Sequence, residues 1–367
     1  MAIFDSAVPV ERIDVSAYKI PTDGEEADGT YRWDHTTLVL VEAIAGGKRG
    51  LGYTYADPAT ATLVRDGLAR EVVGRDAMDV PNCWEGMVHK IRNLGRPGVC
   101  SMAIAAVDVA LWDLKARLLD LSLVTLLGAT RDAAPVYGSG GFTSYSIERL
   151  EAQLGGWVEQ GIPRVKMKIG THPADDLGRV KAAREAIGPH AALYVDANGA
   201  YSRKQALAQA EAFREYGVVW FEEPVSSDDL AGLYLMRDRG PAGMDIAAGE
   251  YGYDLWYFRR MLEAEAVDVL QADASRCAGI TGFLRAAALT ESRGMDLSAH
   301  CAPSLHVAPC CSIARLSPIE YFHDHARIEH LLFDGALTPI EGALRPDRSR
   351  PGLGLEFKRA DATRYAI

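Results

Sequence analysis

The chain has 367 residues, of which 48% are hydrophobic and 24% are charged, and its formal net charge is −11. This length accommodates one wide barrel or two domains with an ordinary globular composition, and the negative charge argues against nucleic acid or an anionic membrane as a partner. Residues Met1–Ile20 show no signal-peptide pattern, and no apolar run approaches the length of a membrane span. The six cysteines have neither zinc nor disulfide spacing, which predicts free thiols in a cytoplasmic protein.

The first third of the chain predicts an α+β unit that begins with strands. Glu11–Lys19 and Thr36–Glu42 have the alternation and β-branched content of strands. The polar, glycine-punctuated stretch Pro21–Asp34 between them predicts a long loop, either an active-site lid or an ordinary mobile hairpin loop. A second turn, rich in Gly and Tyr, is expected at Gly50–Tyr55.

Two amphipathic segments follow and predict helices at Thr60–Val73 and Val99–Asp120. In the second helix the buried face is marked by residues at helical spacing, which are Val107, Leu111, Leu114 and Leu118. Gly128 and the polar residues after it indicate a domain joint.

From Ala134 on, short apolar strands alternate with helical stretches, which predicts parallel strands joined by crossovers, and eight strands predict a closed barrel. The expected strands are Pro135–Gly138, Arg164–Ile169, Leu193–Val195, Val218–Phe221, Ile246–Ala248, Val267–Gln271, Leu297–Ala299 and Ile319–Tyr321. The expected helices are Ile147–Gln160, Asp175–Ile187, Arg203–Tyr216, Trp256–Glu263 and Ile280–Arg293.

Ionisable residues end almost every expected barrel strand, and in such barrels the catalytic groups lie at the carboxyl ends of the strands. Lys166 and Lys168 lie two residues apart in one strand, so their side chains project from the same face. The later strands end, in order, in Asp196, Glu222, Glu250, Asp273, His300 and Glu320.

Three of these residues indicate a metal site. Asp196, Glu222 and Glu250 end consecutive strands and offer hard oxygen ligands, which suit Mg²⁺ completed by water and substrate oxygens. Zinc is disfavoured there, because the set of strand-end residues holds one histidine and no cysteine at ligand spacing.

The remaining strand-end residues indicate acid–base chemistry. Repulsion between Lys166 and Lys168 favours the loss of one proton, which gives a lysine base near neutral pH. Asp273 and His300 end adjacent strands, so the carboxylate can hold the imidazole in one tautomer and raise its basicity. The sequence therefore predicts a lysine and a histidine that face each other across a cavity.

The order and spacing of its motifs make the chain resemble the enolase superfamily, and within it the mandelate racemase subgroup. The motifs are Arg96-Pro97-Gly98, AAVDVALWD (105–113), VKMKIG (165–170), VDANG (195–199), FEEP (221–224), AAGE (247–250), QADASRCAGIT (271–281), His300 and Arg350-Pro351-Gly352-Leu353-Gly354. The resemblance covers nearly the whole chain.

The resemblance implies an α/β fold, a (β/α)7β modified TIM barrel under an α+β N-terminal capping domain. It places the cap at residues 1–128, the barrel at 129–325 and a C-terminal segment returning to the cap at 326–367. It also implies a homo-oligomer and Mg²⁺ bound by Asp196, Glu222 and Glu250. The resemblance assigns the other strand-end residues to proton transfer and substrate binding: Lys168 and the Asp273–His300 dyad as the acid/base catalysts, Lys166 as the modulator of Lys168, and Glu320 as a hydrogen-bond partner of the substrate carboxylate.

The sister subgroup of muconate-cycloisomerase-like enzymes places a lysine on the sixth barrel strand, and residues 267–282 contain none. The mandelate racemase subgroup therefore fits best.

The resemblance implies Mg²⁺-dependent abstraction of the α-proton of a 2-hydroxy carboxylate. The product of this step can go on either to dehydration or to racemisation. Polar and aromatic hydroxyl residues in the cap segments favour an acid-sugar dehydratase, acting on an aldonate or aldarate. The acidic residues of the hairpin, Asp23, Glu25, Glu26 and Asp28, favour a substrate with one carboxylate. A catalytically silent binding protein predicts a broken catalytic position, and the sequence has none.

Overall fold

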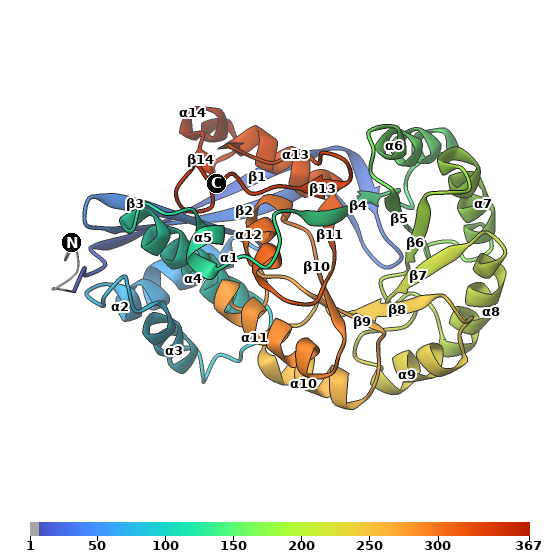
Figure 1. Cartoon of the computed structure of the whole chain (residues 1–367), viewed down its shortest axis with the longest axis horizontal. Helices are drawn as coiled ribbons and strands as arrows, with labels where there is room; N and C mark the ends of the chain where they lie inside the picture. Colours follow the sequence, from blue (N-terminus) through green and yellow to red (C-terminus); the bar gives the residue numbers. More distant parts are fainter. Residues whose placement is uncertain (1–6) are drawn as a thin grey trace.

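In the computed structural model, which describes residues 7–367, a smaller lobe of strands and helices lies beside a barrel (Figure 1). The smaller lobe is the cap. Its sheet has the order β1 (Arg12–Ala27), β2 (Arg32–Ala45) and β3 (Lys48–Tyr55), and all pairs are antiparallel. The sequence analysis expects no signal peptide at Met1–Ile20. Residues 1–6 of that stretch lie outside the described part. No helix within residues 7–367 is long and apolar enough to cross a lipid bilayer.

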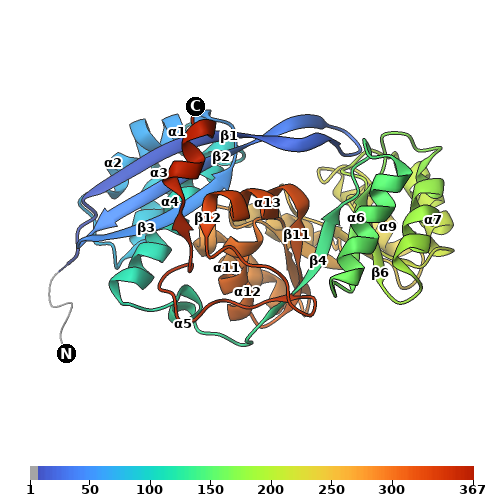
Figure 2. The ribbon, with the colours of Figure 1, turned by 90° about the horizontal axis from the view of Figure 1, so that it is seen from above.

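The prediction of a loop at Pro21–Asp34 is wrong for most of this stretch, because strands β1 and β2 both extend into it. β1 runs to Ala27 and β2 starts at Arg32, with a register irregularity between Pro21 and Glu26. The Asp28 carboxylate accepts hydrogen bonds from the backbone N–H groups of Thr30 and Tyr31, which closes the turn within four residues. The result is a long hairpin that reaches from the cap toward the barrel (Figure 2).

The predicted turn Gly50–Tyr55 is likewise a strand, β3, and its glycines have a packing role. A Cβ at Gly50 would lie 2.3 Å from the carbonyl oxygen of Ala110, and one at Gly52 would lie 2.2 Å from that of Ala106. Both oxygens belong to α4 (Val99–Leu118), so these glycines let the helix lie directly against the sheet. Glycines close together in a sequence are typical of turns, which is why the sequence predicts a turn here. The helix that requires these glycines is distant in the chain.

The expected cap helices are present with small differences. The first is one helical run interrupted by a π turn: α1 (Ala59–Leu63), η1 (Val64–Leu68) and α2 (Ala69–Val72). The described part also holds α3 (Val80–Lys90) and the short α5 (Leu123–Leu127), for which the sequence analysis made no prediction.

Eight parallel strands close the barrel, and β11 pairs with β4 to complete the ring. The strands are β4 (Ala134–Gly140), β5 (Arg164–Lys168), β6 (Ala192–Asp196), β7 (Val218–Glu222), β8 (Asp245–Ala248), β9 (Val269–Ala272), β10 (Asp296–Ala299) and β11 (Leu316–Phe322). The helices between them are α6 (Ile147–Glu159), α7 (Asp176–Ile187), α8 (Arg203–Arg214), α9 (Leu230–Arg239), α10 (Leu255–Glu263), α11 (Gly279–Ser292) and α12 (Pro303–Ser312). This order confirms the (β/α)7β barrel with an N-terminal cap.

The amino-terminal half of the barrel interior is filled by aromatic side chains. Tyr137, Tyr194 and Trp220 form a buried cluster, and the rings of Tyr194 and Trp220 stack with centroids 4.9 Å apart. The interior is therefore a packed floor rather than a pore, and polar side chains begin one layer above it. This floor keeps the strand-end groups at the carboxyl rim.

The last residues of the chain contact the strands of the cap. Helix α13 (His323–Leu332) runs across the expected start of this segment at residue 326. After β12 (Phe333–Asp334) and β13 (Ala343–Leu344), which pairs with β4, the chain reaches β14 (Glu356–Phe357), α14 (Arg359–Ala362) and η2 (Thr363–Tyr365). The backbone N–H of Ile367 donates to Ala17 in β1, and Arg359 pairs with the buried Glu42 of β2.

Candidate active site

The two lysines of β5 project side by side into the barrel, and both are buried. The Nζ atom of Lys166 lies 2.5 Å from Glu222 Oε1, 2.8 Å from Glu320 Oε1 and 3.2 Å from Asp196 Oδ2. Lys168 lies one layer nearer the rim, where it donates to Asp196. Lys166 is therefore fixed among three carboxylates, and Lys168 faces the cavity above.

The three predicted metal ligands meet at the ends of β6, β7 and β8. Asp196 and Glu222 are register partners on adjacent strands, and carboxylate oxygens of Asp196, Glu222 and Glu250 lie within 4.8 Å of one another. Burial and the neighbouring Asp196 carboxylate raise the pKa of Glu222 to about 8. Despite burial, the neighbouring cations Lys168 and His300 instead lower the pKa values of Asp196 and Glu250, respectively. The oxygen-only donor set of the triad fits Mg²⁺.

The charge around Lys168 differs from the prediction made from the lysine pair. Burial and repulsion from Lys166 both act to lower the pKa of Lys168, but attraction to Asp196 and Glu250 outweighs them and raises it. The prediction of a lowered pKa is wrong for this arrangement, because it counted the neighbouring lysine and omitted the carboxylates. A cation bound to Asp196 and Glu250 would compete with Lys168 for the same negative charge.

The Asp273–His300 dyad forms as predicted at the ends of β9 and β10. Asp273 Oδ2 lies 2.9 Å from His300 Nδ1, and the other oxygen accepts from the backbone N–H and hydroxyl of Ser275. The opposite ring nitrogen, Nε2, lies 3.0 Å from Glu250 Oε2. Burial would lower the pKa of His300, but Cys301, Glu250 and Glu320 raise it well above its usual value. The imidazole thus carries a proton on the cavity side, which suits a general acid.

Glu320 lies in β11, two residues before its end, and joins the two halves of the site. Its Oε1 accepts hydrogen bonds from Ser139 Oγ at 2.6 Å and from Lys166, and its Oε2 accepts from the backbone N–H of Cys301 at 3.1 Å. Although burial opposes ionisation, Lys166 and His300 hold the pKa of Glu320 well below its usual range. Glu320 is therefore a carboxylate, and it can donate a hydrogen bond to a substrate carboxylate only after it takes up a proton.

The lysine and the dyad open into one cavity of about 990 Å³ between the barrel rim and the cap hairpin. Lys168, Glu250 and His300 line its barrel side. Residues of the cap line its other side, and they include Glu25, Asp28, Tyr31, Trp33 and Tyr55. The cavity is therefore bounded by both lobes of the chain.

On the cap side of the cavity, the hairpin and β3 differ from two expectations. Of the four acidic residues, Glu25 and Asp28 line the cavity, whereas Asp23 pairs with Arg149 and His323, and Glu26 is buried against Trp33 Nε1. Tyr55 lines the cavity, but Tyr53 is fully buried and donates to Glu329. Tyr53 and Tyr55 are two residues apart in β3, so their side chains project from the same face of the strand. They differ in burial because they lie at different depths under the cap.

The cavity-lining residues absent from the predicted set include two that lie against the dyad, Arg276 and Cys301. Arg276 Nη1 lies 3.6 Å from Glu250 Oε1 and its Nε lies 3.6 Å from Asp273 Oδ2, so it bridges the metal triad and the dyad. Cys301 Sγ lies 3.2 Å from His300 Nε2. Arg276 could have been found from its place three residues after Asp273 in the same loop, whereas the position of the thiol depends on the path of the chain after β10.

Together, the fold and these strand-end groups define an enolase-like barrel protein. Residues 28–128 match the family described as "Mandelate racemase / muconate lactonizing enzyme, N-terminal domain", and residues 149–362 match the one described as "Enolase C-terminal domain-like". The chain therefore belongs to the mandelate racemase/muconate lactonizing enzyme family of the enolase superfamily, which confirms the resemblance found in the sequence.

Individual relatives are similar over almost the whole chain. A mandelate racemase/muconate lactonizing enzyme-like protein from Rubrobacter xylanophilus has 56% identity and a TM-score of 0.96, covering 98% of this chain and 100% of that one. The 3,6-anhydro-alpha-L-galactonate cycloisomerase of Streptomyces coelicolor is 31% identical over 95% of this chain and 98% of its own length. L-talarate/galactarate dehydratase from Salmonella typhimurium, liganded with Mg and L-lyxarohydroxamate, has 25% identity and a TM-score of 0.91 over 100% of this chain and 95% of that one.

Proposed function

We propose that this chain catalyses Mg²⁺-dependent removal of the C2 proton from a 2-hydroxy carboxylate, and that the reaction is the dehydration of an acid sugar to a 2-keto-3-deoxy sugar acid. One observation carries the proposal: Lys168 and His300, whose Nδ1 is held by Asp273, line a single cavity beside a buried triad of carboxylates. A base and an acid on separate strands suit a reaction that takes a proton from one carbon and delivers a proton to the hydroxyl group on the next carbon.

Asp196, Glu222 and Glu250 would hold the Mg²⁺ ion. When bound, the ion would polarise the substrate carboxylate and stabilise the negative charge that develops on it during proton removal. The burial of the triad keeps solvent from weakening this electrostatic contribution. The magnesium in the Salmonella dehydratase supports the same cofactor here.

The side chains of this protein would then move the protons. Lys168 takes the C2 proton, and the electron pair of the C2–H bond is delocalised into the substrate carboxylate. This pair then forms the C2=C3 double bond as the C3–O bond breaks. His300 delivers its Nε2 proton to the C3 hydroxyl, which leaves as water, and the resulting enol tautomerises to the 2-ketone. Repulsion from Lys166 opposes the attraction to Asp196 and Glu250 that keeps Lys168 protonated, and a cation on those carboxylates would weaken that attraction. Lys166 also holds Glu222 and Glu320 in place. Glu320 would bind the substrate carboxylate by a hydrogen bond once it has taken up a proton.

The cavity favours a polyhydroxylated substrate. Its cap side presents hydroxyl, indole and carboxylate groups from Tyr31, Tyr55, Trp33, Glu25 and Asp28, which suit sugar hydroxyls. Glu25 is paired with Arg32 and the Asp28 carboxylate accepts from the N–H groups of the turn, so these two residues do not select an aldonate over an aldarate. The sugar-acid names of the Streptomyces and Salmonella relatives support this substrate class.

A panel of aldonic and aldaric acids, incubated with the enzyme and Mg²⁺, tests the proposal through the 2-keto product. Formation of a 2-keto-3-deoxy acid from at least one sugar, lost when Mg²⁺ is chelated, is the expected result. The opposition of Lys168 and His300 also suits C2 epimerisation, in which the proton returns to the other face. Incorporation of deuterium at C2 from D₂O with an inverted product and no 2-keto acid would replace dehydration by that alternative.

A further inference from the structure

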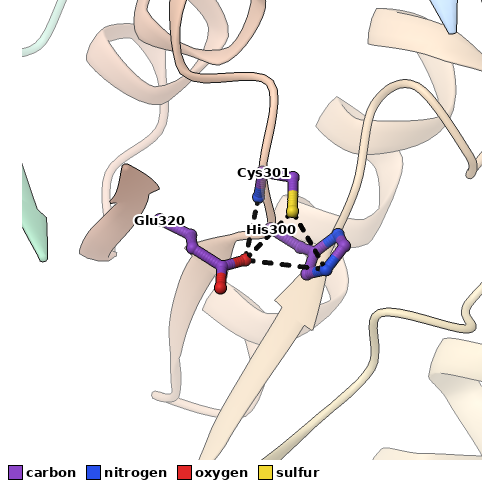
Figure 3. Close-up of side chains that lie close together, drawn as sticks. All are labelled: His300, Cys301 and Glu320. Atoms are coloured by element: carbon purple, nitrogen blue, oxygen red, sulfur yellow. Dashed lines mark hydrogen bonds and ion pairs between the residues drawn. The ribbon is translucent and has the colours of Figure 1, made fainter. Parts of the chain in front are cut away.

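Three different donor side chains converge on the His300 side of the cavity, and we call them the His–Cys–Glu cluster. His300 and Cys301 follow β10, and Glu320 lies in β11 (Figure 3). All three side chains point toward one another, and they are 5%, 3% and 0% exposed, respectively. Cys301 lines the cavity, so the buried cluster is reached from the substrate side. The proton-transfer scheme uses the imidazole and the carboxylate but gives no role to the thiol.

The spacing of the donor atoms is that of a tetrahedral metal site. His300 Nε2 lies 3.2 Å from Cys301 Sγ and 3.6 Å from Glu320 Oε2, and the sulfur lies 3.3 Å from the same oxygen. Zinc bond lengths of about 2.3 Å to sulfur and about 2.1 Å to nitrogen and oxygen, with tetrahedral angles, give donor separations of roughly 3.4–3.6 Å. The three atoms therefore need to shift by only a few tenths of an ångström to share one ion.

Neighbouring residues hold His300 and Glu320 so that one donor atom of each is directed at the cluster. Asp273 occupies His300 Nδ1 at 2.9 Å, as in carboxylate–histidine–zinc arrangements, so Nε2 is the nitrogen that can bind an ion. Nε2 also lies 3.0 Å from Glu250 Oε2, and an ion in the cluster would have to replace that contact. Ser139 and Lys166 occupy Oε1 of Glu320 and leave Oε2 free of side-chain nitrogen donors except His300. Cys301 has a left-handed backbone, with φ of 54°, and this unusual conformation for a non-glycine residue directs its sulfur back toward the ring.

We propose that the His–Cys–Glu cluster is a second cation site that binds zinc or a similar thiolate-seeking divalent ion, and that its occupation blocks turnover. A sulfur, nitrogen and oxygen donor set selects such ions over Mg²⁺, which prefers the all-oxygen triad. The thiol loses its proton to solvent as the metal–sulfur bond forms, and Nε2 must also give up its proton before it can bind. The three protein ligands leave the fourth position facing the cavity.

The consequence for activity follows from the same atoms. An ion in the cluster uses the nitrogen that would protonate the leaving hydroxyl and the carboxylate that would bind the substrate. Inhibition therefore rests on the proposed function, whereas ion binding does not. The two can be separated, because binding to a thiolate has a spectroscopic signature of its own.

Cobalt(II) is the probe, added to the full-length protein in saturating Mg²⁺. The expected result is one equivalent of a near-ultraviolet thiolate-to-cobalt band, with intense visible bands of a tetrahedral site, both abolished by zinc. Cys301→Ser should lose the thiolate band, and Cys100→Ser, which alters a cysteine in the cap, should keep it. In an activity assay, Cys301→Ser should raise the zinc concentration that gives half-inhibition. Loss of residues that support metal ligands weakens metal binding by about 10- to 100-fold, and loss of a ligand should have at least this effect.

A measurement on the unmodified chain guards against loss of folding in the variant. Zinc added in excess Mg²⁺ should slow alkylation of Cys301, followed by peptide mass spectrometry, and should leave the alkylation rates of Cys100 and Cys277 unchanged. Cobalt binding without a thiolate band, or zinc inhibition equal in wild type and Cys301→Ser, would place the ion at the carboxylate triad and overturn the proposal. A thiolate band in a protein inactive on every sugar acid would keep the cation site and reject the proposed function.

Discussion

At the residue scale, His300 and Lys168 are the two groups whose separate roles decide the reaction. His300 Nδ1 is held by Asp273, while Nε2 faces the cavity that Lys168 also lines. We predict that His300→Gln abolishes dehydration but still exchanges the C2 proton of the substrate with D₂O, because Lys168 remains to remove it. NMR of the recovered substrate measures the exchange. Loss of both exchange and dehydration would instead assign proton removal to His300.

The complementary variant is Lys168→Ala. It removes the base, so we expect both C2 exchange and dehydration to fall by about 10²- to 10⁴-fold, the usual contribution of general acid–base catalysis. Substrate binding in the presence of Mg²⁺, measured by calorimetry, should persist, because the carboxylate triad is intact. An unchanged exchange rate would contradict the role of Lys168.

The metal triad gives a prediction that needs no substrate. Mg²⁺ at 100 times its Kd should stabilise the wild-type protein by about 2.7 kcal/mol, and Glu222→Gln should lose most of this thermal shift because a neutral amide is a weaker ligand. Glu223→Gln is the matched control, since it alters the next buried glutamate of the chain, which lies outside the triad. Equal Mg²⁺ shifts in both variants would argue against the triad.

At the element scale, the β1–β2 hairpin is the part of the cap that completes the cavity. Its tip is tied to the barrel: Thr143 N–H donates to Ala27, and Thr171 Oγ1 donates to the carbonyl of Asp28 at 2.6 Å. At Gly29 a Cβ would lie 2.3 Å from the carbonyl oxygen of Ala197. The hairpin is therefore seated on the barrel loops through backbone contacts that tolerate no side chain at residue 29.

Gly29→Ala should lift the hairpin tip and lower kcat/KM by up to about 100-fold, since displacements near 1 Å have effects of that size on positioned groups. The melting temperature should change little, because the tip contributes little to either core. Gly178→Ala is the control: it lies in α7 with open space around its Cα, and it should leave activity unchanged. A parallel fall in activity and stability would show that the hairpin supports the fold rather than the cavity.

At the scale of the whole molecule, the cap and the barrel share buried polar contacts. Tyr53 of β3 donates to Glu329 of α13 at 2.6 Å, and Ser304 N–H donates to the other oxygen at 3.0 Å. Burial raises the pKa of Glu329 to about 7 despite these hydrogen bonds. We propose a division of the chain into a cap, residues 1–128 with the returning segment from 326, and a barrel, residues 129–325. Homo-oligomerisation stays a prediction.

The raised pKa of Glu329 predicts how stability changes with pH. The folded state binds this proton more tightly than the unfolded chain, so the contribution is complete below about pH 4.5 and is lost as the pH rises through about 7. Glu329→Gln should remove this loss, which amounts to the order of 3 kcal/mol, so its free energy of unfolding should fall less between pH 5 and pH 8. Urea unfolding measures the slope, and the exposed Glu185→Gln should leave it as in wild type.

The sequence by itself determined the barrel and most of the strand-end groups, because the barrel strands are short and apolar and almost all carry an ionisable residue at or near their carboxyl end. Lys168, Asp196 and Glu222 can be placed at one rim from local spacing alone. Only the tertiary structure decided what surrounds them. The carboxylates that reverse the pKa shift of Lys168, the helix that explains Gly50 and the loop path that brings Cys301 against His300 and Glu320 all depend on contacts between distant segments, which no local pattern encodes.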